Sequence, residues 1–180
     1  SINMKELAKQ TKALNEDGRT LFENALKTLD DSISETRRIA HALLPKSLDD
    51  FGLVIALEAM IDKIKDSRIF EIRFFTNFEE DERVQQTTEI AIYRIFQEAL
   101  NNIIKHANAS LVEIQLMLNE KNLFLSIEDN GSGYDPELIK DKESSFGLDS
   151  MKNRVQSLKG FINIDSTPGK GTLITIEIPK

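Results

Sequence analysis

The sequence predicts a two-layer α/β sandwich of the α+β class, preceded by a helical hairpin. Residues 1 to about 66 contain no strand-like run, whereas the remainder alternates helical and strand patterns. With 180 residues, the chain has room for one α/β domain and a modest helical appendage. Because the strands come mostly in antiparallel neighbours, with helices between them, we expect helices on one layer and a mostly antiparallel sheet on the other.

The first part of the chain, residues 1–47, reads as part of a dimerisation bundle. Apolar and small residues recur at alternating spacings of four and three over 22–43, which is a heptad seam. A turn around 15–18 separates two helices, and Pro45 ends or bends the second. A lone two-helix hairpin has too little surface to bury this seam, so we expect a symmetric homodimer. Packing of the seam within one chain is the alternative.

The second part, residues 48–180, is expected to form the α/β domain. We expect helices at about 54–64, 82–107 and 148–158, strands at about 70–74, 111–118, 123–128, 161–165 and 173–178, and a mobile loop at 130–145.

Composition narrows the classes of function. The net charge of −7 argues against direct nucleic-acid binding, which needs a basic surface. The lack of cysteine excludes disulfides and cysteine-ligated zinc, and fits the cytoplasm. No apolar run approaches the roughly 18 residues that cross a bilayer. We expect a cytoplasmic domain whose parent protein can still be membrane-anchored, because Ser1 reads like a cut end.

The helix expected at 82–107 has the most informative pattern. Its core side is expected to consist of Phe96, Leu100, Ile103 and Ala107. Glu98, Asn102 and Lys105 share a side about 180° away, at about 100° per residue. Asn102 offers a carbonyl oxygen suited to Mg²⁺, Glu98 can accept a proton, and Lys105, with His106 beside it, can meet a phosphate. An ordinary solvated helix face is the alternative.

Three glycine segments follow in order. Asp129 to Gly133 comes directly after a predicted strand, where a carboxylate can accept a hydrogen bond from an amine and glycines let the backbone pass a flat ring. Gly147 precedes a helix, whose N-terminus suits a phosphate. Gly169 to Thr172 joins the last two strands. Each segment alone is also explained by a surface turn, and no Walker A motif is present.

Taken together, these segments resemble the HATPase domain of the GHKL superfamily (Bergerat-type fold), which includes histidine kinases, Hsp90, gyrase B and MutL. Residues 98–107 resemble its N box, 129–133 its first glycine box, 146–148 its second and 169–172 its last. The resemblance covers about residues 48–180 and rests on four motifs in order. One departure is Ser145, where kinases of this type often have glycine, and it concerns the lid geometry.

The resemblance implies roles for individual residues. By it, Asn102 coordinates Mg²⁺, Asp129 contacts the adenine amine, Glu98 helps to activate the phosphoacceptor histidine, and Lys105 and His106 lie near the phosphates. The nucleotide pocket would be shaped and lined by Gly131, Gly133, Gly147, Leu148, Gly169, Gly171 and Thr172. The implied cofactors are ATP and Mg²⁺.

Segments 39–45, 48–53 and 105–107 are similar to the sensor histidine kinases that partner LuxR-type response regulators. In that subgroup the acceptor lies in a stretch like Arg-Ile-Ala-Arg-Glu-Leu-His-Asp. Aligned over 38–45, the acceptor position falls on Leu44, so His41 is not expected to be phosphorylated. The acceptor is expected upstream of Ser1.

The expected function is therefore the core of a two-component sensor histidine kinase. It would transfer the γ-phosphoryl of Mg-ATP to a bundle histidine and on to a response-regulator aspartate, and this chain alone would not autophosphorylate. Two alternatives remain open: an anti-sigma-type protein-serine kinase on the same fold, and a non-catalytic dimerisation or nucleotide-sensing module.

Overall fold

The computed structural model describes Phe22, Ala25 and residues 27–29, 46–67, 70–79, 82–135 and 145–180. The chain divides into two compact units, Ser1–Leu44 and Pro45–Lys180. The few described residues of the first unit are helical. The expected hairpin turn, most of the heptad seam, His41, Pro45 and most of the expected 130–145 loop lie outside the described residues.

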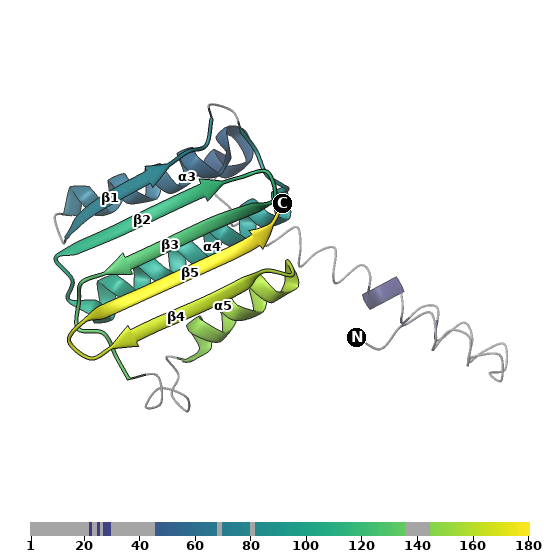
Figure 1. Ribbon diagram of the computed structural model, residues 1–180. Helices are drawn as coiled ribbons and strands as arrows, with labels where there is room; N and C mark the ends of the chain where they lie inside the picture. The colour runs from purple at the N-terminus through teal and green to yellow at the C-terminus, as the bar shows by residue number, and fades with distance from the viewer. Residues whose placement is uncertain are drawn as a thin grey trace. The chain divides into compact units, whose positions relative to one another are not determined.

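Five strands form one sheet in the described part of the second unit, in the order β1-β2-β3-β5-β4 (Figure 1). They are β1 (Glu71–Thr76), β2 (Leu111–Leu118), β3 (Asn122–Asp129), β4 (Phe161–Thr167) and β5 (Gly171–Pro179). The β1–β2 pair is parallel, and the other three pairs are antiparallel. The mostly antiparallel sheet expected from the sequence is confirmed.

The helices form the second layer. They are α3 (Lys46–Ser67), α4 (Gln86–Asn102), the π-helix η2 (Ile103–Ala107) and α5 (Ser145–Ser157). Figure 1 shows α3, α4 and α5 against one face of the sheet. No helix in the described ranges is long and apolar enough to span a membrane.

The core lies between these two layers. In β2, Val112, Ile114 and Leu116 are buried while Glu113 and Gln115 on the other face are exposed, as period-two alternation requires. The core side expected for the long helix is confirmed, since Phe96, Leu100, Ile103 and Ala107 are all buried.

Helix α3 is longer than expected and is kinked. It begins at Lys46, whereas the sequence predicted a start near Val54, and Gly52 inside it has φ 87°. Only glycine takes this backbone conformation freely, so the helical hydrogen-bonding pattern breaks there. The Arg83 side chain fills the space beside the kink, with Cδ 2.9 Å from where a β-carbon on Gly52 would lie. The residues before the kink, from Lys46, are helical as well.

The end of the long helix also differs from the expectation. A regular α-helix was predicted through Ala107, but α4 ends at Asn102 and continues as the wider η2 turn. Asn108 then ends the helix in the left-handed conformation, with φ 49°. Widened π turns are rare and occur frequently at functional sites. Here the widened turn changes which side chains after Asn102 face the site.

Candidate functional site

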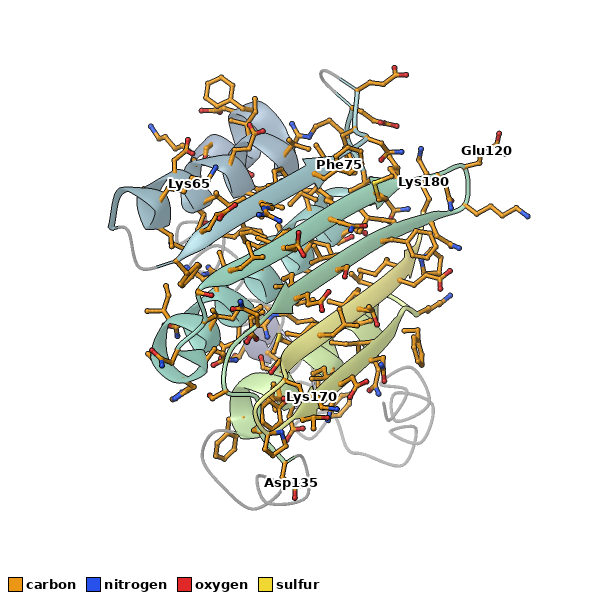
Figure 2. All side chains as sticks on the ribbon, turned by 60° about the vertical axis from the view of Figure 1, so that its left-hand side comes forward. Lys65, Phe75, Glu120, Asp135, Lys170 and Lys180 are labelled. Atoms are coloured by element: carbon orange, nitrogen blue, oxygen red, sulfur yellow. The ribbon has the colours of Figure 1, made fainter. Side chains whose placement is uncertain are left out.

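A cavity of about 430 Å³ lies at the end of the sheet where β3 ends and β5 begins. Its walls come from the end of α4, from η2, from the segment after β3 and from the first turn of α5. The lining residues are Ala99, Asn102, Ile103, His106, Ala107, Ile127, Asp129, Ser132, Gly133, Tyr134, Asp135, Leu148, Thr172 and Ile174. Figure 2 shows Asp135 and Lys170 at this end of the sheet, with Glu120 at the opposite end. The cavity has the size and mixed lining of a small-molecule site.

Asp129 lies at the floor of the cavity. It is the last residue of β3, is 4% exposed and pairs in register with Thr172 of β5. Its Oδ1 accepts a hydrogen bond of 2.8 Å from the Gly131 backbone N–H. Burial raises the pKa of Asp129, while hydrogen bonds from Gly131 and from the amide and hydroxyl of Thr172 act to lower it. These donors fix the orientation of a buried carboxyl group that faces the cavity and can accept a further hydrogen bond from a ligand.

Asn102 and His106 lie on the helical wall. Both line the cavity, Asn102 as the last residue of α4 and His106 within η2. Lys105, which the helical spacing grouped with Asn102, is exposed and is not among the lining residues. The wider η2 turn accounts for this difference, because successive side chains rotate by less than in an α-helix. One amide side chain and one imidazole therefore line the cavity from this wall.

The segment after β3 is fastened to the end of η2. The Ser132 N–H donates to the Ala107 carbonyl at 2.6 Å, and the Ser132 hydroxyl donates to the His106 carbonyl at 3.1 Å. Asn130 accepts hydrogen bonds from the Ser110 and Leu111 amides at 2.9 and 3.0 Å. These contacts satisfy carbonyls at the helix end and hold the floor and the helical wall in one fixed geometry.

Two glycines permit the close approach of backbones that forms this floor. A β-carbon on Gly131 would collide with the Ala107 carbonyl, and one on Gly171 would collide with the Asp129 carbonyl oxygen. Gly171 also has φ 84°, which disfavours any side chain there. Gly169 has a similar φ of 79°, but no atom lies within 4 Å of its would-be β-carbon, and its N–H donates to the Ser132 carbonyl at 2.6 Å.

The start of α5 closes one side of the site. Leu148 lines the cavity. Gly147, one residue before it, lies against Glu98 of α4, so that a β-carbon there would collide with the Glu98 carboxylate. Glu98 is half-buried and is not a lining residue. The carboxylate is thus placed at the edge of the cavity, between α4 and α5.

The structure brings together most residues that the sequence singled out. Asn102, His106, Asp129, Gly133, Leu148 and Thr172 line one cavity. Glu98, Gly131, Gly147 and Gly171 adjoin it, whereas Lys105 and Gly169 lie on the exposed surface near it. Tyr134, which lines the cavity, and Ser166, which contacts Tyr134, were not predicted from the sequence. Tyr134 directly follows the glycine segment, a position that could have indicated it. Ser166 gave no motif signal.

Comparison with known proteins assigns the family. Residues 87–180 match the family described as histidine kinase-, DNA gyrase B-, and HSP90-like ATPase. The chain is 34% identical over 151 residues to the oxygen sensor histidine kinase NreB of Staphylococcus carnosus, covering 82% of this chain and 42% of that protein. It is 38% identical over 153 residues to the signal transduction histidine-protein kinase/phosphatase DegS of Brevibacillus brevis, covering 85% of this chain and 39% of that protein. The chain thus spans about two fifths of these relatives.

Solved structures show the same fold. A histidine kinase domain from the blue-light activated histidine kinase EL346 of Erythrobacter litoralis superposes with a TM-score of 0.57 at 22% identity, covering 74% of this chain and 68% of that one. This likeness confirms the predicted fold class, and the family match confirms the resemblance seen in the motifs. The chain belongs to the histidine kinase-, DNA gyrase B-, and HSP90-like ATPase family.

Proposed function

We propose that this chain is the cytoplasmic catalytic core of a two-component sensor histidine kinase, which binds Mg-ATP for transfer of its γ-phosphoryl group to a histidine. The observation that supports this most is that Asn102 and Asp129, from separate motifs, line the same cavity. The names of relatives such as NreB and DegS, which are histidine kinases, favour this function within the family.

The floor of the cavity suits an adenine ring. The buried Asp129 carboxylate can accept a hydrogen bond from the exocyclic amine, and its orientation is fixed by Gly131 and Thr172. Apolar side chains of Ile127, Leu148 and Ile174 line the same cavity and can contact the faces of a flat ring. A base with an amine donor at its edge therefore satisfies both the polar and the apolar parts of this floor.

The helical wall suits the phosphates with Mg²⁺. Bound Mg²⁺ would neutralise phosphate charge, and Asn102 is the residue we assign as its ligand. The described residues contain no group of three histidine, cysteine or carboxylate side chains that would hold a metal. One amide oxygen fits an ion that keeps several waters and shares phosphate ligands, so Mg²⁺ would bind together with the nucleotide. We assign His106 and the exposed Lys105 to the phosphate end.

Glu98 is proposed to act at the phosphoryl-transfer step. It lies at the cavity edge against Gly147, where it can orient an incoming histidine and accept its proton. We assign the role of phosphoryl acceptor to a histidine N-terminal to this chain. A response regulator with a LuxR-type output would then receive the phosphoryl group from that histidine. The homodimer through the 1–47 bundle likewise stays a proposal.

The two alternatives have less support. An anti-sigma-type protein-serine kinase does not account for the heptad seam in 22–43 or for the 48–53 segment. A non-catalytic module with a degenerate pocket does not account for the complete set of motifs, in which Asn102 and the oriented Asp129 carboxylate line one cavity. Incubation of this chain with radiolabelled ATP tests where the phosphoacceptor histidine lies. Under our proposal the chain stays unlabelled, and label that disappears in a His41→Asn variant would overturn the upstream acceptor.

Calorimetric titration with ATP tests the nucleotide site. We expect Asn102→Ala to remove the Mg²⁺-dependent part of ATP affinity, so that titrations with Mg²⁺ and with EDTA become equal. Asn101→Ala is the matched control, because Asn101 is the adjacent residue of α4 and does not line the cavity. We expect Asp129→Asn to weaken ATP by about 10- to 100-fold through loss of a charge-assisted hydrogen bond. Unchanged Mg²⁺ dependence in Asn102→Ala would count against the proposal.

A further inference from the structure

Ser166 is a buried hydroxyl beside the site that no motif includes. It lies in β4, is 7% exposed, pairs in register with Thr172 of β5 and does not line the cavity. The Tyr134 backbone N–H donates to its Oγ at 2.9 Å. Its Oγ lies 3.1 Å from the Gly171 carbonyl oxygen and 2.9 Å from Thr172 Oγ1, within hydrogen-bond distance of both. One side chain therefore links the segment after β3 to the start of β5, on either side of Asp129.

The direction of these hydrogen bonds follows from proton counting. A serine hydroxyl has one proton, and here two acceptors compete for it, the Gly171 carbonyl and Thr172 Oγ1. If the proton goes to Thr172, the Thr172 hydroxyl keeps its own proton for the Asp129 carboxylate. If it goes to Gly171, the Thr172 hydroxyl either donates to Ser166, and Asp129 loses a donor, or donates to Asp129, and the Ser166–Thr172 hydrogen bond is lost. Hydrogen bonds to a carboxylate are the stronger kind, which favours the first arrangement.

Resting on the nucleotide-binding function proposed above, we propose that Ser166 is a positioning residue for nucleobase recognition. It fixes the Thr172 hydroxyl so that it donates to Asp129, and it fixes the backbone of Tyr134, which lines the cavity. Loss of this hydroxyl leaves the Tyr134 N–H without its acceptor and loosens both neighbours of Asp129. The expected consequence is a carboxylate that distinguishes less sharply between a base with an exocyclic amine and one without it.

The test compares two nucleotides by calorimetry, ATP and purine riboside triphosphate, which lacks the exocyclic amine. We expect the wild-type chain to prefer ATP by about 10- to 100-fold, as for a hydrogen bond to a charged group. We expect Ser166→Ala to narrow this preference by about fivefold or more, and Ser166→Thr, which keeps a hydroxyl, to restore it. Ser126→Ala is the matched control, because Ser126 lies in β3 of the same sheet on the strand face opposite to Leu125 and Ile127.

The outcomes separate this proposal from the one on which it rests. If the wild-type chain binds neither nucleotide, the proposed nucleotide-binding function fails. If the wild-type chain prefers ATP and Ser166→Ala keeps the same preference, the positioning role is overturned while the function stands. An equal weakening of both nucleotides also overturns it, because a purely structural defect would not select between bases. Should Ser166→Ala fail to fold, Ser166→Cys, which has nearly the same shape and a weaker donor, gives the same comparison.

Discussion

The ion pair between Arg83 and Glu89 is predicted to fix the kinked start of α3. Glu89 is 1% exposed, and its two oxygens accept bonds of 2.7 Å from Nε and Nη2 of Arg83. The same Nη2 donates to the Leu48 carbonyl at 3.2 Å, just before the kink at Gly52. Glu89→Gln keeps the shape but replaces one acceptor oxygen with a donor that faces the guanidinium.

The magnitude follows from the burial of the two partners. Breaking a buried ion pair costs about 3–5 kcal/mol, but the Arg83 side chain is 41% exposed and recovers part of its hydration. We therefore expect Glu89→Gln to lower the free energy of unfolding by about 2–3 kcal/mol. In a unit of this size that corresponds to a fall in Tm of roughly 6–15 °C.

The assay is urea and thermal unfolding of the full chain followed by circular dichroism. Glu71→Gln is the matched control, since Glu71 pairs with Arg73 at 2.8 Å but both side chains are about 60% exposed. We expect no resolvable change in that control, because exposed pairs contribute little. Equal stability of Glu89→Gln and the wild type would refute the reasoning, as would an equal loss in both variants.

Two further predictions concern the cavity floor. Gly171→Ala should abolish ATP binding and lower Tm, because its β-carbon would meet the Asp129 carbonyl oxygen. Gly169 is also at a positive φ, 79°, but no atom lies within 4 Å of its would-be β-carbon, so Gly169→Ala should lower Tm by less and keep ATP binding. Calorimetry and thermal unfolding check both variants, and normal ATP binding by Gly171→Ala would contradict the prediction. The raised pKa of Asp129 means that the folded chain holds this proton more tightly than the unfolded chain. The wild type should therefore lose free energy of unfolding as pH rises from about 4 through the raised pKa of Asp129, because the folded chain must then give up this proton. The Asp129→Asn variant has no such proton, so the difference in unfolding free energy between the wild type and the variant should fall over this pH range. Urea titrations at several pH values check this, and a relative stability that rises with pH would contradict it.

Much of the fold could be predicted because period-two and helical patterns report burial directly. The range 111–118 was predicted as a strand and is β2 to the residue; its buried residues alternate with exposed or half-buried ones, and Glu113 and Gln115 fall on the exposed face. The extra first turn of α3 could not be predicted, because its support comes from Arg83, distant in sequence. The π turn of η2 was also missed, since local spacing does not distinguish it from an α-helix.

The candidate site, like the fold, could be predicted from the sequence only in part. Asn102 and Asp129 could be singled out because each lies in a motif whose residue types suit a nucleotide. Lys105 was grouped with Asn102 on α-helical spacing, and the π turn places it outside the lining residues. Ser166 acts through contacts with Tyr134 and Thr172 that come together only in the folded sheet. The sequence motifs therefore identify the side chains expected to contact the nucleotide, but they do not identify the neighbouring residues that orient those side chains.

The central claim is that a magnesium nucleotide is bound between the end of α4 and the floor at Asp129. A crystal structure of the chain with Mg²⁺ and a non-hydrolysable ATP analogue tests it most directly. Our account predicts the adenine amine within hydrogen-bond distance of the Asp129 carboxylate, and the metal on the Asn102 oxygen. A nucleotide bound elsewhere, or a base that does not contact Asp129, would contradict it.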